Sequence, residues 1–222
     1  LANNATGQTA KALVSGGGGF DTIRLSGGAG LNLSRISNFG GMGLEENSRI
    51  ESIERIDLAT DSSANALVLA AKDVKDMAGM NLFRTGSASA DGKTWTNVSG
   101  TALSANTAFH QLQVDGGNTD SLVLNTHLGV WTNAGTVSNG TSNYTVYQNT
   151  ATNTQVLVQS GVAVSVPPVL LYSSPSDNAY MLALGNNITL TFDQAVEKGT
   201  GTIGIYKTAD NTLLETAYDV AS

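Results

Sequence analysis

The fold is decided near the start of the chain, in the stretch Gly16-Gly17-Gly18-Gly19-Phe20-Asp21-Thr22-Ile23-Arg24-Leu25. Glycine permits turns with positive φ and close approach between chain segments. From Thr22 to Leu25 polar and apolar residues alternate, which is the pattern of a half-buried β-strand. Asp21 lies where the turn meets the strand. Two roles are open to it: an oxygen ligand for a cation, or a side chain that holds the turn through backbone hydrogen bonds.

Two later segments repeat part of this pattern. Asp21–Leu25, Asn65–Leu69 and Asp120–Leu124 all read Asp or Asn, a small residue, an aliphatic residue, any residue, Leu. Their spacing is uneven, so the chain is not a regular solenoid. We expect an all-β fold in which residues 1–166 form an irregular β-roll of stacked strands or a β-sandwich. The one predicted helix lies within Ala70–Met80, where apolar residues recur at helical spacing.

The composition favours a secreted or cell-surface protein. Of the 222 residues 41% are hydrophobic and only 13% are charged, a balance typical of secreted β-proteins. The net charge of −7 argues against nucleic acid as a partner, because phosphates repel an acidic surface. Cysteine is absent, which excludes disulfides, thiol catalysis and cysteine zinc sites. No apolar run reaches the roughly 18 residues of a membrane span.

A second domain is predicted after Pro167-Pro168, because two prolines stiffen a linker and cannot occupy a central strand. We therefore place the domains at 1–166 and 167–222. In the second domain Asn187–Phe192 and Gly201–Tyr206 alternate as strands do. An immunoglobulin-like sandwich needs about 7 strands in about 100 residues, and this part has room for about four. The chain begins at Leu1, and we expect it to be a segment of a longer protein whose second domain is incomplete.

The motifs resemble those of large bacterial surface proteins. Gly16–Arg24 resembles one unit of the G-G-x-G-x-D-x-apolar-x repeat of RTX proteins, whose turns bind calcium between stacked strands. Residues 168–220 resemble bacterial Ig-like domains, and residues 1–166 resemble the segments beside such domains in giant RTX-type adhesins. The likeness to Ig-like domains is carried by Pro168, Ser174–Asn178, Asn187–Val196 and Gly199–Ile205. The likeness to adhesin segments is carried by Gly19–Leu25, Ile53–Leu58, and the stretch from Trp131-Thr132 through Tyr144–Tyr147.

Calcium is the candidate cofactor, because carboxylate and amide oxygens at turns suit a hard cation. Asp115, Asn118 and Asp120 surround a Gly-Gly bend and form the first candidate site. Their spacing departs from the EF-hand loop, and the alternative is a hairpin turn held by its own Asp and Asn side chains. Asp21 and Asp57 are the further candidate ligands. A full RTX site shares each ion between adjacent turns, and only one copy of the repeat is present.

The sequence does not predict an enzyme. Neither histidine, His110 or His127, lies in a hydrolase or metalloprotease motif. Glu51 and Glu54 could form a glycosidase pair, but pairing with arginine on a solvated face is the simpler interpretation. Trp95 and Trp131 are read as core residues rather than as a platform for sugars.

The predicted function is therefore structural and adhesive, within a secreted or surface-exposed bacterial protein. The expected partners are a surface glycan or protein receptor and neighbouring domains of the same chain. The alternative is a carbohydrate-binding or carbohydrate-active β-helix domain, which requires a groove with two carboxylates and a stacked tryptophan. A segment of an RTX toxin or protease is a third reading. Five residues of the second domain are expected to pack on the first or to pair with another chain, as in a strand-swapped dimer: Ile188, Leu190, Phe192, Ile203 and Ile205.

Overall fold

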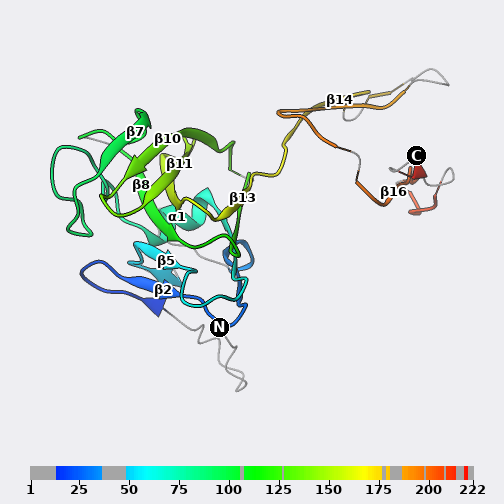
Figure 1. Cartoon of the computed structure of the whole chain (residues 1–222). Helices are drawn as coiled ribbons and strands as arrows, with labels where there is room; N and C mark the ends of the chain where they lie inside the picture. Colours follow the sequence, from blue (N-terminus) through cyan, green and yellow to red (C-terminus); the bar gives the residue numbers. More distant parts are fainter. Residues whose placement is uncertain are drawn as a thin grey trace. The chain divides into compact units, whose positions relative to one another are not determined.

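The computed structural model describes residues 14–36, 49–105, 108–126, 128–176, 179–180, 187–197, 199–207, 209–213 and 218–219. The chain divides into two compact units, Leu1–Pro167 and Pro168–Ser222. Strands dominate both units (Figure 1), and the prediction of an all-β fold is confirmed. In the described ranges no helix combines the length and apolar character that crossing a membrane requires.

Eight strands of the first unit form two parallel stacks. One sheet contains β2 (Thr22–Arg24), β5 (Arg55–Asp57), β8 (His110–Asp115) and β12 (Thr154–Gln159). The other contains β3 (Gly30–Asn32), β6 (Ala66–Ala70), β9 (Ser121–Asn125) and β13 (Ala163–Ser165). Along the chain a strand of the first sheet precedes each strand of the second. The pairs β2–β3, β5–β6, β8–β9 and β12–β13 are therefore four stacked rungs, the arrangement of a β-roll.

The parallel register aligns aliphatic side chains from rung to rung, and these ladders fill the space between the sheets. Ile56 lies between Ile23 and Val114 in one sheet. Leu67 lies beside Leu122 in the other. Ile56, Leu67, Val114 and Leu122 are fully buried in one continuous core. Because each rung alone cannot cover its apolar face, stacking is what buries this core.

Short elements return the chain from the second sheet to the first. The 3₁₀ turn η1 (Leu33–Arg35) follows β3, and α1 (Ala71–Met77) follows β6. β1 (Val14–Ser15) pairs in parallel with β4 (Ile50–Glu51), just before β2 and β5 begin. The helix predicted within Ala70–Met80 is present, and it buries Val74 and Met77 against the core.

The first sheet continues beyond the rungs with three antiparallel strands. β11 (Asn143–Asn149) pairs with β12, β10 (Thr132–Ser138) pairs with β11, and β7 (Thr96–Gly100) forms the far edge. A second core lies on this extension, where Trp95 packs at 5.2 Å from Phe83 and 4.9 Å from Tyr144, measured between ring centroids. Trp95 and Trp131 are 0% and 4% exposed. Both tryptophans are therefore core residues, and neither forms a platform for sugars.

The described part of the second unit contains two strand pairs. β14 (Leu170–Ser174) pairs antiparallel with β15 (Thr189–Phe192), and β16 (Thr202–Ile203) pairs antiparallel with β17 (Tyr218–Asp219). β15 and β16 lie within the two alternating segments. Ile188 and Leu190 are 60% and 45% exposed, whereas Phe192 and Ile205 are half-buried. The side chain of Ile203 lies outside the described residues, and pairing with another chain stays a prediction.

Candidate functional site

The turns between the two stacked sheets contain a hydrogen-bonded ladder of Asp and Asn side chains. Asp120 precedes β9, and its Oδ1 accepts a hydrogen bond from the Asn65 backbone N–H at 3.0 Å. Asn65 precedes β6, and its Oδ1 accepts a hydrogen bond from the Ala29 N–H at 2.9 Å. Ala29, Asn65 and Asp120 occupy equivalent positions in successive rungs. Each side chain thus fixes the turn of the rung before it.

Both oxygens of Asp120 are used within the protein. Its Oδ2 accepts a hydrogen bond from the Gly117 N–H at 2.8 Å, and the residue is only 2% exposed. Asn118, at the tip of the same turn, is exposed. Backbone N–H groups thus occupy the Asp120 carboxylate, as expected of a side chain that stabilises its own turn.

Asp115 ends β8 and bonds a different set of groups. Its Oδ2 lies 3.6 Å from the Arg55 guanidinium, and its Oδ1 accepts hydrogen bonds from Tyr144 Oη at 2.9 Å and Gln113 Nε2 at 2.7 Å. Burial of Tyr144, together with the negative charge of Asp115, raises the pKa of the tyrosine far above its ordinary value. The network joins the rungs to the antiparallel extension through buried polar groups.

Asp57 is held by two local contacts. Its Oδ2 lies 3.5 Å from Arg24 Nε, and its Oδ1 accepts a hydrogen bond from the Ala59 N–H at 3.1 Å. Nearby Asp61 accepts hydrogen bonds from the Gly27 N–H at 2.6 Å and the Ser63 N–H at 2.9 Å. The bond from Gly27 is the main reason that the pKa of Asp61 lies below its ordinary value. Like Asp115 and Asp120, these carboxylates already have partners.

Asp21 differs from the other four predicted ligands. Its backbone N–H donates to Glu54 Oε2 at 2.7 Å, and its own Oδ2 is buried without a hydrogen-bond partner. Glu54 is 7% exposed. Burial, more than the nearby Asp21 charge, raises the pKa of Glu54 above its ordinary value. Glu54 is thus buried and Asp21 half-buried beside it, with one buried Asp21 oxygen unsatisfied, which is costly away from water.

The glycine run begins at Gly16, which lies against Asp21 and has no room for a larger residue. A Cβ on Gly16 would lie 2.0 Å from the Ser52 carbonyl oxygen and 2.5 Å from Asp21 Cβ. Glycine is required at position 16 by close approach of the chain. The interpretation of Glu54 as a partner of arginine on a solvated face is wrong, because Glu54 is buried and the register of β2 and β5 brings it beside Asp21. Sequence reasoning missed this pair.

His110 has a structural partner. Its Nδ1 lies 2.8 Å from the Ala78 carbonyl oxygen, and since a carbonyl only accepts, Nδ1 is the protonated nitrogen. His127 lies outside the described residues. Within the described ranges no three acidic, histidine or cysteine residues come together in a group that could hold a metal ion. The calcium assignments for Asp115, Asn118, Asp120, Asp21 and Asp57 stay predictions.

The comparisons with known proteins do not identify the chain. No protein-family model, no curated protein and no solved structure matches it.

Proposed function

We propose that the chain is a structural and adhesive module of a secreted or cell-surface bacterial protein. The observation that carries the proposal is the turn ladder, in which the buried polar groups of Asn65 and Asp120 bond neighbouring rungs. Polar groups used in this way build a stiff stacked scaffold and leave few for chemistry. The resemblance to RTX-type adhesins and Ig-like domains in the sequence supports the same function.

The carbohydrate-active alternative has less support. It requires a groove that contains two carboxylates and a stacked tryptophan. The pocket between β11, β12 and β13 has neither in its lining, and both tryptophans are buried. The neighbouring acids Asp21 and Glu54 lie elsewhere, where Gly16 contacts Asp21 and the Asp21 N–H donates to Glu54.

Calcium enters this proposal at one place in particular. At Asp57, Asp115 and Asp120 an ion would compete with existing hydrogen bonds or ion pairs. At Asp21 it would provide a partner for an oxygen that lacks one. Two carboxylates are fewer than the six to eight oxygens that calcium takes, so backbone carbonyls and water would supply the remainder. We propose Asp21 and Glu54 as the acids of a calcium-stabilised turn.

Retention of coated beads under flow tests the adhesive function. Beads that carry the purified chain are passed over bacterial and animal cell layers, and beads that carry albumin are the control. An adhesive module retains several times more beads, and soluble glycans that release them identify a sugar receptor. Retention equal to that of albumin on every surface contradicts the adhesive part. Release of reducing sugars from polysaccharides would support the carbohydrate-active alternative instead.

A further inference from the structure

The two stacked sheets end at different places, and this leaves a step in the first unit. In the described part of the chain the sheet of β3, β6, β9 and β13 stops at β13, whereas the other sheet continues past β12 with β11, β10 and β7. Strands in both sheets are spaced by about 4.8 Å. A strand added to β13 would therefore lie opposite β11, as β13 lies opposite β12.

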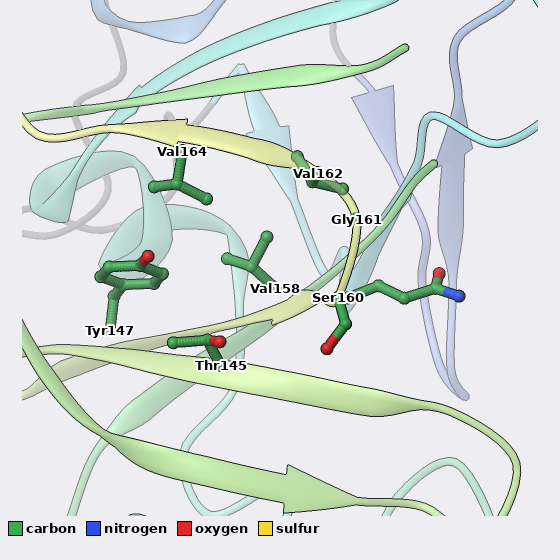
Figure 2. A pocket seen from close by; sticks show the side chains of 8 residues that line it. Thr145, Tyr147, Val158, Ser160, Gly161, Val162 and Val164 are labelled. Carbon is green, nitrogen blue, oxygen red and sulfur yellow. The ribbon is translucent and has the colours of Figure 1, made fainter. Parts of the chain in front are cut away.

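A pocket of about 290 Å³ occupies this step. Thr145 and Tyr147 on β11 and Val158 on β12 point into it, and Val164 on β13 points back toward them (Figure 2). Thr145 and Tyr147 are half-buried, while the alternate residues of β11 face the second core. The facing sides of β11 and β13 thus bound a space at the place where strands lie in the rungs below.

β13 has an unpaired edge beside the pocket. In the described part of the chain it pairs only with β9. The Ala163 N–H donates to the Asp120 carbonyl at 3.0 Å, and backbone groups alternate in direction along a strand. The N–H and C=O of Val164 consequently point away from β9, and an edge of this kind is a template for a further strand.

We propose that this step binds an extended, uncharged peptide segment of a partner protein, which adds as a strand to β13. Backbone hydrogen bonds to Val164 would hold the segment, and one of its uncharged side chains would enter the pocket. In strand addition the backbone bonds usually provide affinity and the side-chain pocket provides specificity. The lining contains no charged residue: Thr145, Tyr147, Val158, Gln159, Ser160, Gly161, Val162 and Val164. An inward-facing charge would be buried without a partner. The inference does not rest on the adhesive function proposed above.

The geometry favours a peptide over a second copy of this chain. The space lies between the edge of β13 and the face of β11. A folded second copy would bring its own β13 together with the sheet that lies behind it. Proline is excluded at the bonding position of the segment, because it lacks the N–H that the Val164 carbonyl requires.

Peptide binding to the full 222-residue chain tests the proposal. The probe is a blocked, fluorescent peptide of alternating threonine and valine, measured by polarisation. Two matched peptides serve as controls: one is N-methylated on alternate amides, and one has aspartate in place of the central valine. We expect saturable binding of the first peptide and affinities at least about tenfold lower for both controls. Absence of saturable binding, or equal binding of the N-methylated peptide, overturns the proposal.

Two protein variants locate the site. Thr145→Lys places a charge in the pocket, and we expect it to weaken binding about tenfold. Val98→Lys places the same charge on β7, an edge strand of the larger sheet, where Val98 is 57% exposed. We expect it to bind the peptide as the parent chain does. Loss of binding in Val98→Lys but not in Thr145→Lys would assign the peptide to the wrong edge and overturn the proposal.

Sedimentation of the free chain tests the competing occupant. A monomer is expected at the concentrations used for binding. A dimer that Thr145→Lys dissociates would show that a second copy fills the step, and the assignment to a partner peptide would fall. The N-methylated peptide needs no protein variant, so the proposal stays testable even where Thr145→Lys does not fold.

Discussion

At the scale of single residues, the turn between β8 and β9 depends on one carboxylate. Asp120 is buried and accepts backbone hydrogen bonds from Asn65 in the preceding rung and from Gly117 in its own turn. Asp61 makes comparable bonds from a solvent-exposed position. Comparison of Asp120 with Asp61 therefore separates the contribution of burial to stability from that of hydrogen bonding.

We predict that Asp120→Ala lowers the free energy of unfolding by about 3 kcal/mol, because two buried N–H groups lose a charged acceptor. Asp61→Ala is the matched control, with an expected loss of about 1 kcal/mol or less, since water replaces its bonds. Urea unfolding measures both. Equal losses in the two variants would contradict the structural role of Asp120.

The Asp21–Glu54 pair predicts a pH dependence with a definite sign. The pKa of Glu54 is raised in the folded protein above its ordinary value of 4.5. The folded state therefore binds the Glu54 proton more tightly than the unfolded state does. This contribution to stability is complete below the unfolded pKa and disappears as pH rises through the folded pKa.

Glu54→Gln removes this titration and keeps an oxygen acceptor for the Asp21 N–H. We therefore expect the variant to gain stability relative to the parent chain as pH rises from about 4 to 7. Urea unfolding at several pH values measures the difference. A difference that is constant, or that shrinks as pH rises, would contradict the assignment.

Calcium should relieve the same pair if it binds there. An ion at 100 times its dissociation constant adds about 2.7 kcal/mol to stability, a rise of several degrees in Tm. We expect Asp21→Asn to abolish the rise and Asp57→Asn to leave it unchanged. A thermal melt in calcium, in magnesium and in chelator provides the measurement. No calcium-specific rise in the parent chain would restrict Asp21 to a structural role.

The sequence predicted the turn ladder of Asn65 and Asp120 better than it predicted the contact between Asp21 and Glu54. The shared pattern of Asn65–Leu69 and Asp120–Leu124 correctly indicated equivalent strands, β6 and β9. Asp21–Leu25 was grouped with them, but β2 belongs to the other sheet. Its true equivalent is Glu54–Leu58, which reads acid, polar, Ile, charged, Leu in the same order. The repeat can be seen in the sequence, but only the strand register shows that Asp21 and Glu54 lie side by side.

At the scale of elements, β7 is attached to the sheet through a close contact between two glycines. A Cβ on Gly135 of β10 would lie 2.2 Å from the Ser99 carbonyl oxygen, and Gly135 has φ of +131°. The pairing of β10 with β7 shifts register just beyond this position. The contact sets how closely the edge strand can approach.

We predict that Gly135→Ala detaches β7 and costs about 3 kcal/mol, because steric overlap adds to an unfavourable backbone conformation. Gly140→Ala is the control: Gly140 also has positive φ, at +84°, but open space surrounds its Cβ position. It should cost about 1 kcal/mol. Hydrogen exchange of the β7 amides reports the attachment. Unchanged protection of β7 in Gly135→Ala would refute this explanation.

Strand positions were easier to predict than strand order. Alternation located β2, β9 and β15, and helical spacing located α1. The place of β7 in the sheet was not predictable, because β7 lies far before β10 in the chain and pairs with it only across the sheet. The alternation of polar and apolar residues within a segment does not indicate which distant strand that segment pairs with.

At the scale of the whole molecule, the buried apolar residues of the described part of the chain all belong to the first unit. They run from Leu25 to Val162. Described residues of the second unit include large exposed side chains such as Tyr172 and Ile188. Because apolar burial is the main source of stability, the two units should differ in resistance to opening.

We expect hydrogen exchange to be slowest in β8 and β12, which lie in the middle of the larger sheet. Exchange in β14 and β15 should be faster by orders of magnitude, because local opening there exposes little additional apolar surface. Mass spectrometry of the exchanged chain measures both regions. Equal protection in β8 and β15 would show that the second unit has stability of its own or from a partner.

The turn ladder also has a direction along the chain. The acceptor for Ala29 comes from Asn65, and the acceptor for Asn65 comes from Asp120. In each case the later residue completes the earlier turn. A chain synthesised from its N-terminus therefore cannot complete the turns at Ala29 and Asn65 until the following rung is present. We expect these turn contacts to form in order along the chain, as each following rung arrives.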